Sequence, residues 1–270
     1  MSTTIEVLLV ILLGVLVVLL LQLREGQSRL RDEVRYDIPP SLRARITGSI
    51  VAIVRGSSET GVAFFISPRV ALTVAHNLLL ASSPTSVMRR VNCVRPGVRP
   101  SIGEATFAFD VVAHDTKLDF AVLRLRAGER ASAHYLPVHS AEDALGDNSV
   151  FLVTCNIRLA HEAPDITCVS VTIRRAHVTN VHEHHVLYDA QAFDGDSGGA
   201  LIIGRSGEVI GLHKEAVNAA RELIEQKEAL DERLDSVELS VKALVQGTAY
   251  GCIGVRVDSN TARDLISAAE

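Results

Sequence analysis

The sequence predicts an all-β domain built as two antiparallel β-barrels, with an apolar helix before it and a helical insertion near its end. Short apolar runs of strand length alternate with turn signals between about residues 49 and 257. An apolar run occupies Val7–Leu21, and residues 215–246 contain neither Gly nor Pro. These features divide the chain into a transmembrane anchor at residues 1–23, a charged linker at 24–45 and a globular domain at 46–270.

Composition excludes some classes of protein. At 270 residues the chain can form one or two hydrophobic cores, and a net charge of −5 argues against nucleic-acid binding, which normally requires a basic face. Trp is absent, with only 4 Tyr and 7 Phe, so the cores are expected to be aliphatic. The four cysteines form no CxxC pair, which argues against a zinc ribbon: Cys93, Cys155, Cys168 and Cys252.

The run Val7–Leu21 predicts a membrane anchor. Extended to Ile5 and Leu23 it covers about nineteen residues, just enough for a helix to span a bilayer. The alternatives are a cleaved signal peptide and a buried helix. No Lys or Arg precedes the run and no small-x-small site follows it, so a signal peptide fits less well.

Arginines after this run predict the orientation in the membrane. They are mixed with acidic residues in the linker and lie at Arg24, Arg29, Arg31 and Arg35. Because Lys and Arg mark the cytoplasmic flank, we expect a single-pass membrane protein with its globular domain in the cytosol.

The globular part begins after Pro39-Pro40, which we expect to end regular structure in the linker. A loop is expected at residues 81–103 and a terminal helix at 261–269, capped by Ser259, Asn260 or Thr261. Strands are expected at 49–54, 62–66, 70–75, 104–113, 120–125, 149–155, 166–175, 184–190, 200–203, 209–213 and 249–257.

Residues 215–246 show a heptad seam. Apolar residues spaced alternately three and four apart, with one charged position at Lys227, are Ala220, Leu223, Leu230, Leu234, Val237, Val241 and Leu244. The seam predicts helix, as either a coiled coil through which the chain self-associates or a hairpin packed on the barrel.

The stretch Asp194–Leu201 carries the strongest chemical signal. Its core, Gly195-Asp196-Ser197-Gly198-Gly199, surrounds a Ser with residues that allow a very tight turn. Such a turn exposes the Ser197 hydroxyl and directs the N–H groups of Gly195 and Ser197 to one point, which predicts a nucleophile beside an oxyanion hole.

Two further stretches supply a base and a carboxylate. They are Thr73-Val74-Ala75-His76 and Asp119-Phe120-Ala121-Val122-Leu123. Together with the Ser197 turn they resemble the three motifs of trypsin-like serine proteases, in the order His, Asp, Ser. The resemblance covers about residues 46–213 and 249–270 and implies a fold of two six-stranded antiparallel β-barrels.

The resemblance implies a serine endopeptidase acting on polypeptides through an acyl-enzyme, without cofactor or metal. Ser197 is then the nucleophile, His76 the general base and Asp119 the residue that orients the imidazole. Two other functions remain open: a latent or non-catalytic scaffold that binds partners through residues 215–246, and a hydrolase of esters.

Substrate choice follows from the same resemblance. Gln191 corresponds to the base of the specificity pocket, and Val209-Ile210-Gly211-Leu212-His213 is similar to a strand of glutamyl endopeptidases. His213 is therefore expected to favour an acidic residue before the cleaved bond, and the alternative is a packed His with no such role. Lys214-Glu215-Ala216 departs from the Gly-containing segment with which relatives bind substrate backbone.

The resemblance also bears on whether the domain needs proteolytic cleavage to become active. Many relatives pair the carboxylate equivalent to Asp196 with an amino terminus made by proteolysis. Arg45-Ile46-Thr47-Gly48 resembles such a cleavage site, but it lies close to the first strand, so we expect a domain that needs no cleavage.

The cysteines secreted relatives carry near the catalytic His and Ser are absent from Ala75-His76-Asn77 and Gln191-Ala192-Phe193. We therefore expect buried free thiols and a reducing compartment. His182 and His184 are predicted to share one face of a strand, which leaves room for a metal with two ligands; without a third nearby, no metal site is expected.

Overall fold

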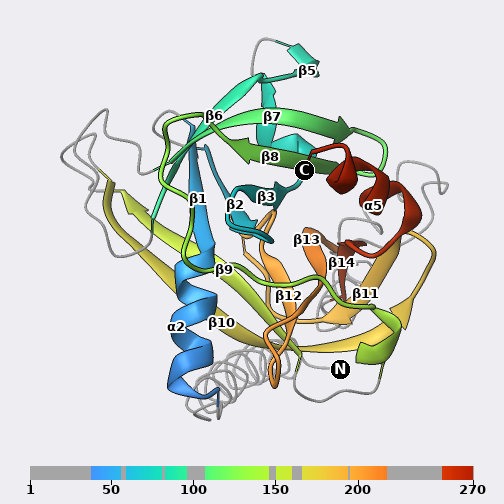
Figure 1. The fold of residues 1–270 in the computed structure, drawn as a ribbon. Helices are drawn as coiled ribbons and strands as arrows, with labels where there is room; N and C mark the ends of the chain where they lie inside the picture. Colours follow the sequence, from blue (N-terminus) through green and yellow to red (C-terminus); the bar gives the residue numbers. More distant parts are fainter. Residues whose placement is uncertain are drawn as a thin grey trace, which may run out of the picture. The chain divides into compact units, whose positions relative to one another are not determined.

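The computed structural model describes residues 38–55, 59–80, 83–95, 107–145, 150–159, 166–193, 195–217 and 251–269. Within these residues the fold is all-β, with two closed antiparallel barrels of six strands each, as predicted (Figure 1). The two α-helices described are α2, Pro40–Ser49, and α5, Asn260–Ser267.

The first barrel has the strand order β1-β2-β3-β8-β7-β6. Its strands are β1 Ile50–Arg55, β2 Glu59–Phe65, β3 Val70–Thr73, β6 Arg90–Val94, β7 Phe107–Asp115 and β8 Phe120–Leu125. A separate two-stranded sheet pairs β4, Leu79–Leu80, with β5, Ser83–Val87. Strands β5 and β6 lie in the segment 81–103, so the prediction of a loop there was wrong.

The second barrel has the strand order β10-β11-β14-β13-β12-β9. Its strands are β9 Val150–Leu159, β10 Ile166–Val181, β11 His185–Asp189, β12 Ala200–Ile203, β13 Val209–Val217 and β14 Gly251–Arg256. Strand β10 pairs with β9 along most of its length and continues beyond it to pair with β11.

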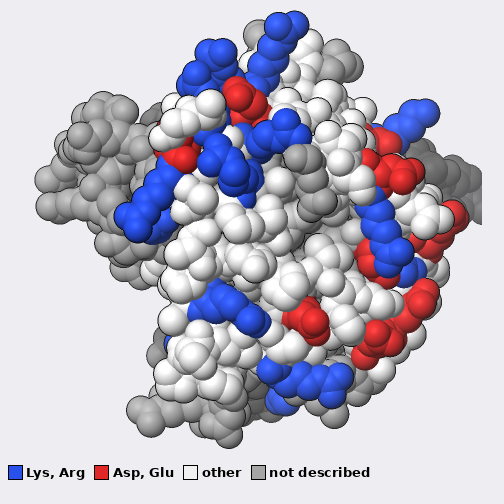
Figure 2. All heavy atoms as spheres, viewed as in Figure 1, with Lys and Arg blue, Asp and Glu red and all other residues white. Residues whose placement is uncertain are grey.

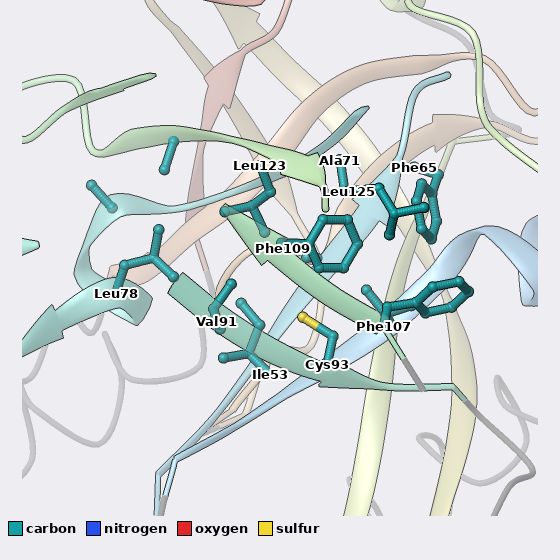
Figure 3. Close-up of a cluster of buried hydrophobic side chains, with 14 residues drawn as sticks. Ile53, Phe65, Ala71, Leu78, Val91, Cys93, Phe107, Phe109, Leu123 and Leu125 are labelled. Atoms are coloured by element: carbon teal, nitrogen blue, oxygen red, sulfur yellow. The ribbon is translucent and has the colours of Figure 1, made fainter. Parts of the chain in front are cut away.

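The cores are mainly aliphatic, as predicted, but the first barrel also uses aromatic rings. Phe65 lies edge-on to Phe107, with ring centroids 5.2 Å apart, and Phe109 packs 5.5 Å from Phe65 (Figure 3). In the second core Tyr188 is the aromatic member. Cys93, Cys155 and Cys252 are buried free thiols, in agreement with the prediction.

Helix α2 begins at Pro40, where we expected the prolines to end regular structure, and it includes part of the segment assigned to the linker. Proline is favoured in the first turn of a helix because its fixed φ suits a helix and its missing N–H is not needed there. Leu42 and Ile46 are buried, and Arg45 donates to the carbonyl of Ser206.

Helix α5 has the predicted position and cap. The hydroxyl of Ser259 accepts a hydrogen bond from the backbone N–H of Ala262 at 3.3 Å. Arg124 of β8 donates to the carbonyl of Ala269, just beyond the helix.

Several predictions fall outside the described residues: the anchor at 1–23, most of the linker at 24–45, and the heptad seam. Across the part of the chain that is described, no helix is long and apolar enough to cross a membrane. The helical insertion was predicted to begin at residue 215, and this start was wrong. Glu215, Ala216 and Val217 continue β13, where they pair with Ile253, Cys252 and Gly251 of β14.

The surface carries charges of both signs. Figure 2 shows Lys and Arg interspersed with Asp and Glu on one face, with uncharged areas between them. Arg90 and Arg126, for example, lie 3.5 Å and 3.9 Å from the carboxylate of Asp110.

Candidate active site

The side chains of His76 and Asp119 meet at the ends of two paired strands. His76 lies on a short 3₁₀ turn, Ala75–Leu78, after β3, and Asp119 directly precedes β8. Thr73 of β3 pairs with Ala121 of β8, so the two segments emerge side by side. Nδ1 of His76 lies 2.7 Å from Oδ2 of Asp119, and the backbone N–H of His76 donates to Oδ1 at 2.9 Å.

Asp119 has an uncommon backbone conformation, with φ at 62°. This left-handed region disfavours most residues, but Asp tolerates it. Burial raises the pKa of the Asp119 carboxyl, but the hydrogen bonds and charge of His76 outweigh that effect, so the pKa lies below its ordinary value. The carboxylate is therefore ionised at neutral pH and accepts the Nδ1 proton of His76, which leaves Nε2 as the basic nitrogen.

The turn that holds Ser197 lies between β11 and β12. Gly195 and Gly198 have φ values of 90° and 84°. A Cβ on Gly198 would collide with the carbonyl of Val62, so the turn also needs a glycine there for space. The N–H of Gly198 is held by the carbonyl of His213 at 2.8 Å, whereas the N–H groups of Gly195 and Ser197 donate to no acceptor in the described chain. Such unpaired donors are what an oxyanion hole requires.

Ser197 joins the second barrel to the first. Its carbonyl accepts hydrogen bonds from the backbone N–H of Val62 and from Nδ2 of Asn77, each at 2.8 Å. Its hydroxyl points to the carbonyl of Lys214 at 3.4 Å, and the described structure holds no hydrogen bond between that hydroxyl and His76. The structure thus joins His76 to Asp119 directly and Ser197 to the residue after His76. Hydrogen bonds between a nucleophile and its base are often long or misaligned before substrate binds.

Asp196 has an internal partner that sequence analysis did not identify. Oδ2 of Asp196 accepts from Nη2 of Arg174 at 2.5 Å and from the backbone N–H of Phe193 at 2.6 Å. Arg174, on β10, also donates to Oγ1 of Thr154, and the Phe193 ring lies 5.1 Å from its guanidinium carbon. The side chains of Arg174 and Asp196 are 10% and 7% exposed, so this is a buried ion pair. A single Arg in a strand carries no sequence signal that marks it as the partner of Asp196.

His213 is almost fully buried on β13, where its backbone contacts the Ser197 turn. Nδ1 of His213 lies 2.5 Å from the hydroxyl of Tyr188, which is also buried. Burial lowers the pKa of His213 to about 4, so the ring is neutral at pH 7. Gln191 is exposed on the segment between β11 and the turn.

The histidines near residue 183 do not lie as expected. His182 and Glu183 belong to a turn between β10 and β11, closed by the bond from His182 N–H to the His185 carbonyl. The prediction that His182 and His184 share one face of a strand was wrong, because β10 ends at Val181. No group of three or more His, Cys, Asp or Glu side chains suited to a metal occurs among the residues described.

Comparison with known proteins gives a family and a fold. The family of trypsin-like peptidase domains matches residues 60–212, more than half of the chain.

Among solved structures, the fold resembles the active form of the Rv3671c protease from M. tuberculosis. The identity is 17%, the TM-score is 0.53, and the match covers 88% of this chain and 87% of that one. The inactive form of the same protease gives 18% identity and a TM-score of 0.51, covering 88% and 96%. A Glu endopeptidase in complex with MPD gives 12% identity and a TM-score of 0.50, covering 83% and 90%. No curated protein matches the sequence.

Proposed function

Because the chain belongs to the trypsin-like peptidase family, we propose that it is a serine endopeptidase acting through Ser197, His76 and Asp119. The Ser197 oxygen attacks the peptide carbonyl while Nε2 of His76 takes its proton. His76 then gives that proton to the leaving amine as the C–N bond breaks, and water hydrolyses the resulting acyl-enzyme ester. The observation that carries the proposal is the double hydrogen bond from His76 to Asp119 beside the Ser197 turn.

The position of the Ser197 hydroxyl is compatible with this role. At 3.4 Å its hydrogen bond to the Lys214 carbonyl is long and therefore weak. Rotation of the hydroxyl toward His76 thus loses little hydrogen-bond energy. The N–H groups of Gly195 and Ser197 would stabilise the oxyanion that forms on the attacked carbonyl. Loss of one such donor typically costs about 3 kcal/mol in the transition state.

The Arg174–Asp196 ion pair supports a domain that needs no activating cleavage. Arg174 supplies the positive charge that a new amino terminus supplies in many relatives. The residue after the candidate cleavage site, Ile46, is fully buried within α2, and Arg45 is bonded to Ser206. A helix packed in this way does not present the extended backbone that proteases bind.

Labelling with a fluorophosphonate tests the proposed function. We expect the folded wild-type chain to be labelled at Ser197 and Ser197→Ala to remain unlabelled, because only a Ser activated by its base reacts readily. A wild-type chain that is folded but does not react would favour the latent scaffold. Repeating the test after replacing residues 218–246 with a short linker, which keeps Glu215–Val217 in β13, shows whether the insertion blocks the site.

We also propose that His213 favours Glu or Asp before the cleaved bond, as the similarity to a Glu endopeptidase suggests. In this proposal the Tyr188 hydroxyl, 2.5 Å from Nδ1, donates its proton to that nitrogen. The proton of the neutral ring then lies on Nε2, which can donate to a substrate carboxylate. Cleavage of a peptide library should therefore be enriched in acidic residues, and the enrichment should fall in His213→Gln. A library cleaved without acidic enrichment contradicts this preference, and turnover of esters but not peptides would favour the ester hydrolase.

A further inference from the structure

The carbonyl of Ser197 is held by two donors from the first barrel. One is the backbone N–H of Val62, on β2, and the other is Nδ2 of Asn77, each at 2.8 Å. Asn77 directly follows His76 on the same 3₁₀ turn. Its side chain is therefore a direct connection between the turn that carries the proposed base and the residue that carries the proposed nucleophile.

The Asn77 amide belongs to a closed ring of hydrogen bonds. The hydroxyl of Thr73 donates to the Val62 carbonyl at 2.7 Å, and Nδ2 of Asn77 donates to that hydroxyl at 3.1 Å. Nδ2 thus uses one hydrogen for Thr73 and the other for Ser197, while the N–H of Val62 completes the ring. The Ser197 carbonyl can only accept, and the Thr73 hydrogen is already used, so the amide must present its nitrogen to both.

The surroundings leave no space for another arrangement. Asn77 is 8% exposed and Thr73 is fully buried. A Cβ on Gly61 would collide with the Asn77 amide, and one on Gly198 would approach that amide to 3.0 Å. A longer side chain at 77 therefore does not fit, and Ser or Thr supplies one hydrogen where two are used.

We propose that Asn77 is a positioning residue that sets the distance between His76 and Ser197 across the two barrels. This inference rests on the proposed function, since it concerns the same reaction. By fixing the Ser197 carbonyl, the amide also fixes the peptide plane from which the hydroxyl and the N–H of Ser197 are directed. The shift of reacting groups by about 1 Å costs roughly 100-fold in rate.

The test is Asn77→Leu, which has nearly the same shape but no donors. In this variant the Ser197 carbonyl keeps the backbone N–H of Val62 as a donor, and the Thr73 hydroxyl still donates to the carbonyl of Val62. We expect kcat per titrated active site to fall about 10- to 100-fold while KM changes less than about 3-fold, because the variant misplaces reacting groups and does not touch the substrate.

Ser132→Ala is the matched control. Ser132 is 4% exposed and its hydroxyl donates to the His134 carbonyl at 2.7 Å, away from the site. The control should lose thermal stability without a change in kcat. Equal kcat values for Asn77→Leu and wild type, or equal losses in Asn77→Leu and the control, would overturn the inference.

Hydrogen exchange separates this inference from the proposed function. In Asn77→Leu we expect the amides of Val62 and Gly198 to exchange faster while those of Leu123 and Leu152, in the two barrel cores, are unchanged. If wild-type Ser197 does not react with the fluorophosphonate, the proposed function fails but exchange still tests the connection. If wild type reacts and neither kcat nor exchange changes in Asn77→Leu, the inference alone fails.

Discussion

Replacing Arg174 with Met is expected to lower the free energy of unfolding by about 3–5 kcal/mol, the usual cost of leaving one member of a buried ion pair without its partner. Asp196 would keep the N–H of Phe193 but lose the guanidinium 2.5 Å away. Because Asp196 lies between Gly195 and Ser197, its displacement also moves the two N–H groups proposed for the oxyanion hole. In the fraction that still folds, kcat should fall about 100- to 1000-fold, as for loss of one oxyanion donor.

Urea unfolding and fluorophosphonate labelling measure the two effects. The double variant Arg174→Met with Asp196→Asn is the control, since the neutral amide oxygen of Asn can still accept from Phe193 without a buried charge. It should recover most of the stability lost in the single variant. A single variant as stable as wild type would show that the pair contributes little, and a double variant no more stable than the single one would show that packing is responsible.

The parts of the site that were predicted from sequence are those with local signatures. The Ser197 turn requires glycine because Gly198 has a positive φ and lies against the Val62 carbonyl, and such constraints appear in the sequence itself. His76 and Asp119 each stand at the end of an apolar strand, and pairing of β3 with β8 brings them together.

The site residues that were not predicted from sequence contact partners far away along the chain. Arg174 lies 22 positions before Asp196, and Asn77 lies 120 positions before Ser197. Neither spacing has a periodicity that local structure could impose, because each contact depends on how β10 or β3 packs in its barrel. Tyr188 beside His213 is of the same kind. Such partners become visible only when the strand order and register are known.

The errors in secondary structure have local causes. The pair Pro39-Pro40 predicts an end to regular structure, but a proline is equally suited to the first turn of a helix, where the structure places Pro40. Strands β5 and β6 were missed because Ser83–Val87 and the Arg-rich segment after it resemble a loop in composition. Glu215–Val217 has the residue types of a helix, but pairing with β14 outweighs that propensity.

Asp119→Asn should lower kcat about 10,000-fold while the fold is retained. The backbone φ of 62° suits Asn as well as Asp, so the turn is preserved. The amide oxygen can keep the bond to the His76 backbone, but the amide nitrogen then faces Nδ1 and donates to it. The imidazole proton is forced onto Nε2, so the ring can no longer accept the proton of Ser197.

We also expect the stability difference between wild type and Asp119→Asn to depend on pH. The pKa of Asp119 is lower in the folded chain than its ordinary value of about 4, so the carboxylate contributes stability above that pH and the contribution is lost as the pH falls through the folded value. The difference in unfolding free energy between wild type and Asp119→Asn should therefore shrink below about pH 4.

The matched control for the loss of kcat is Asp115→Asn. Asp115 accepts from the N–H groups of Lys117 and Leu118 in the same turn without contacting His76. Its kcat should equal that of wild type. If Asp119→Asn keeps kcat within about tenfold of wild type, the tautomer of His76 is not set by Asp119, and the proposed triad loses its third member.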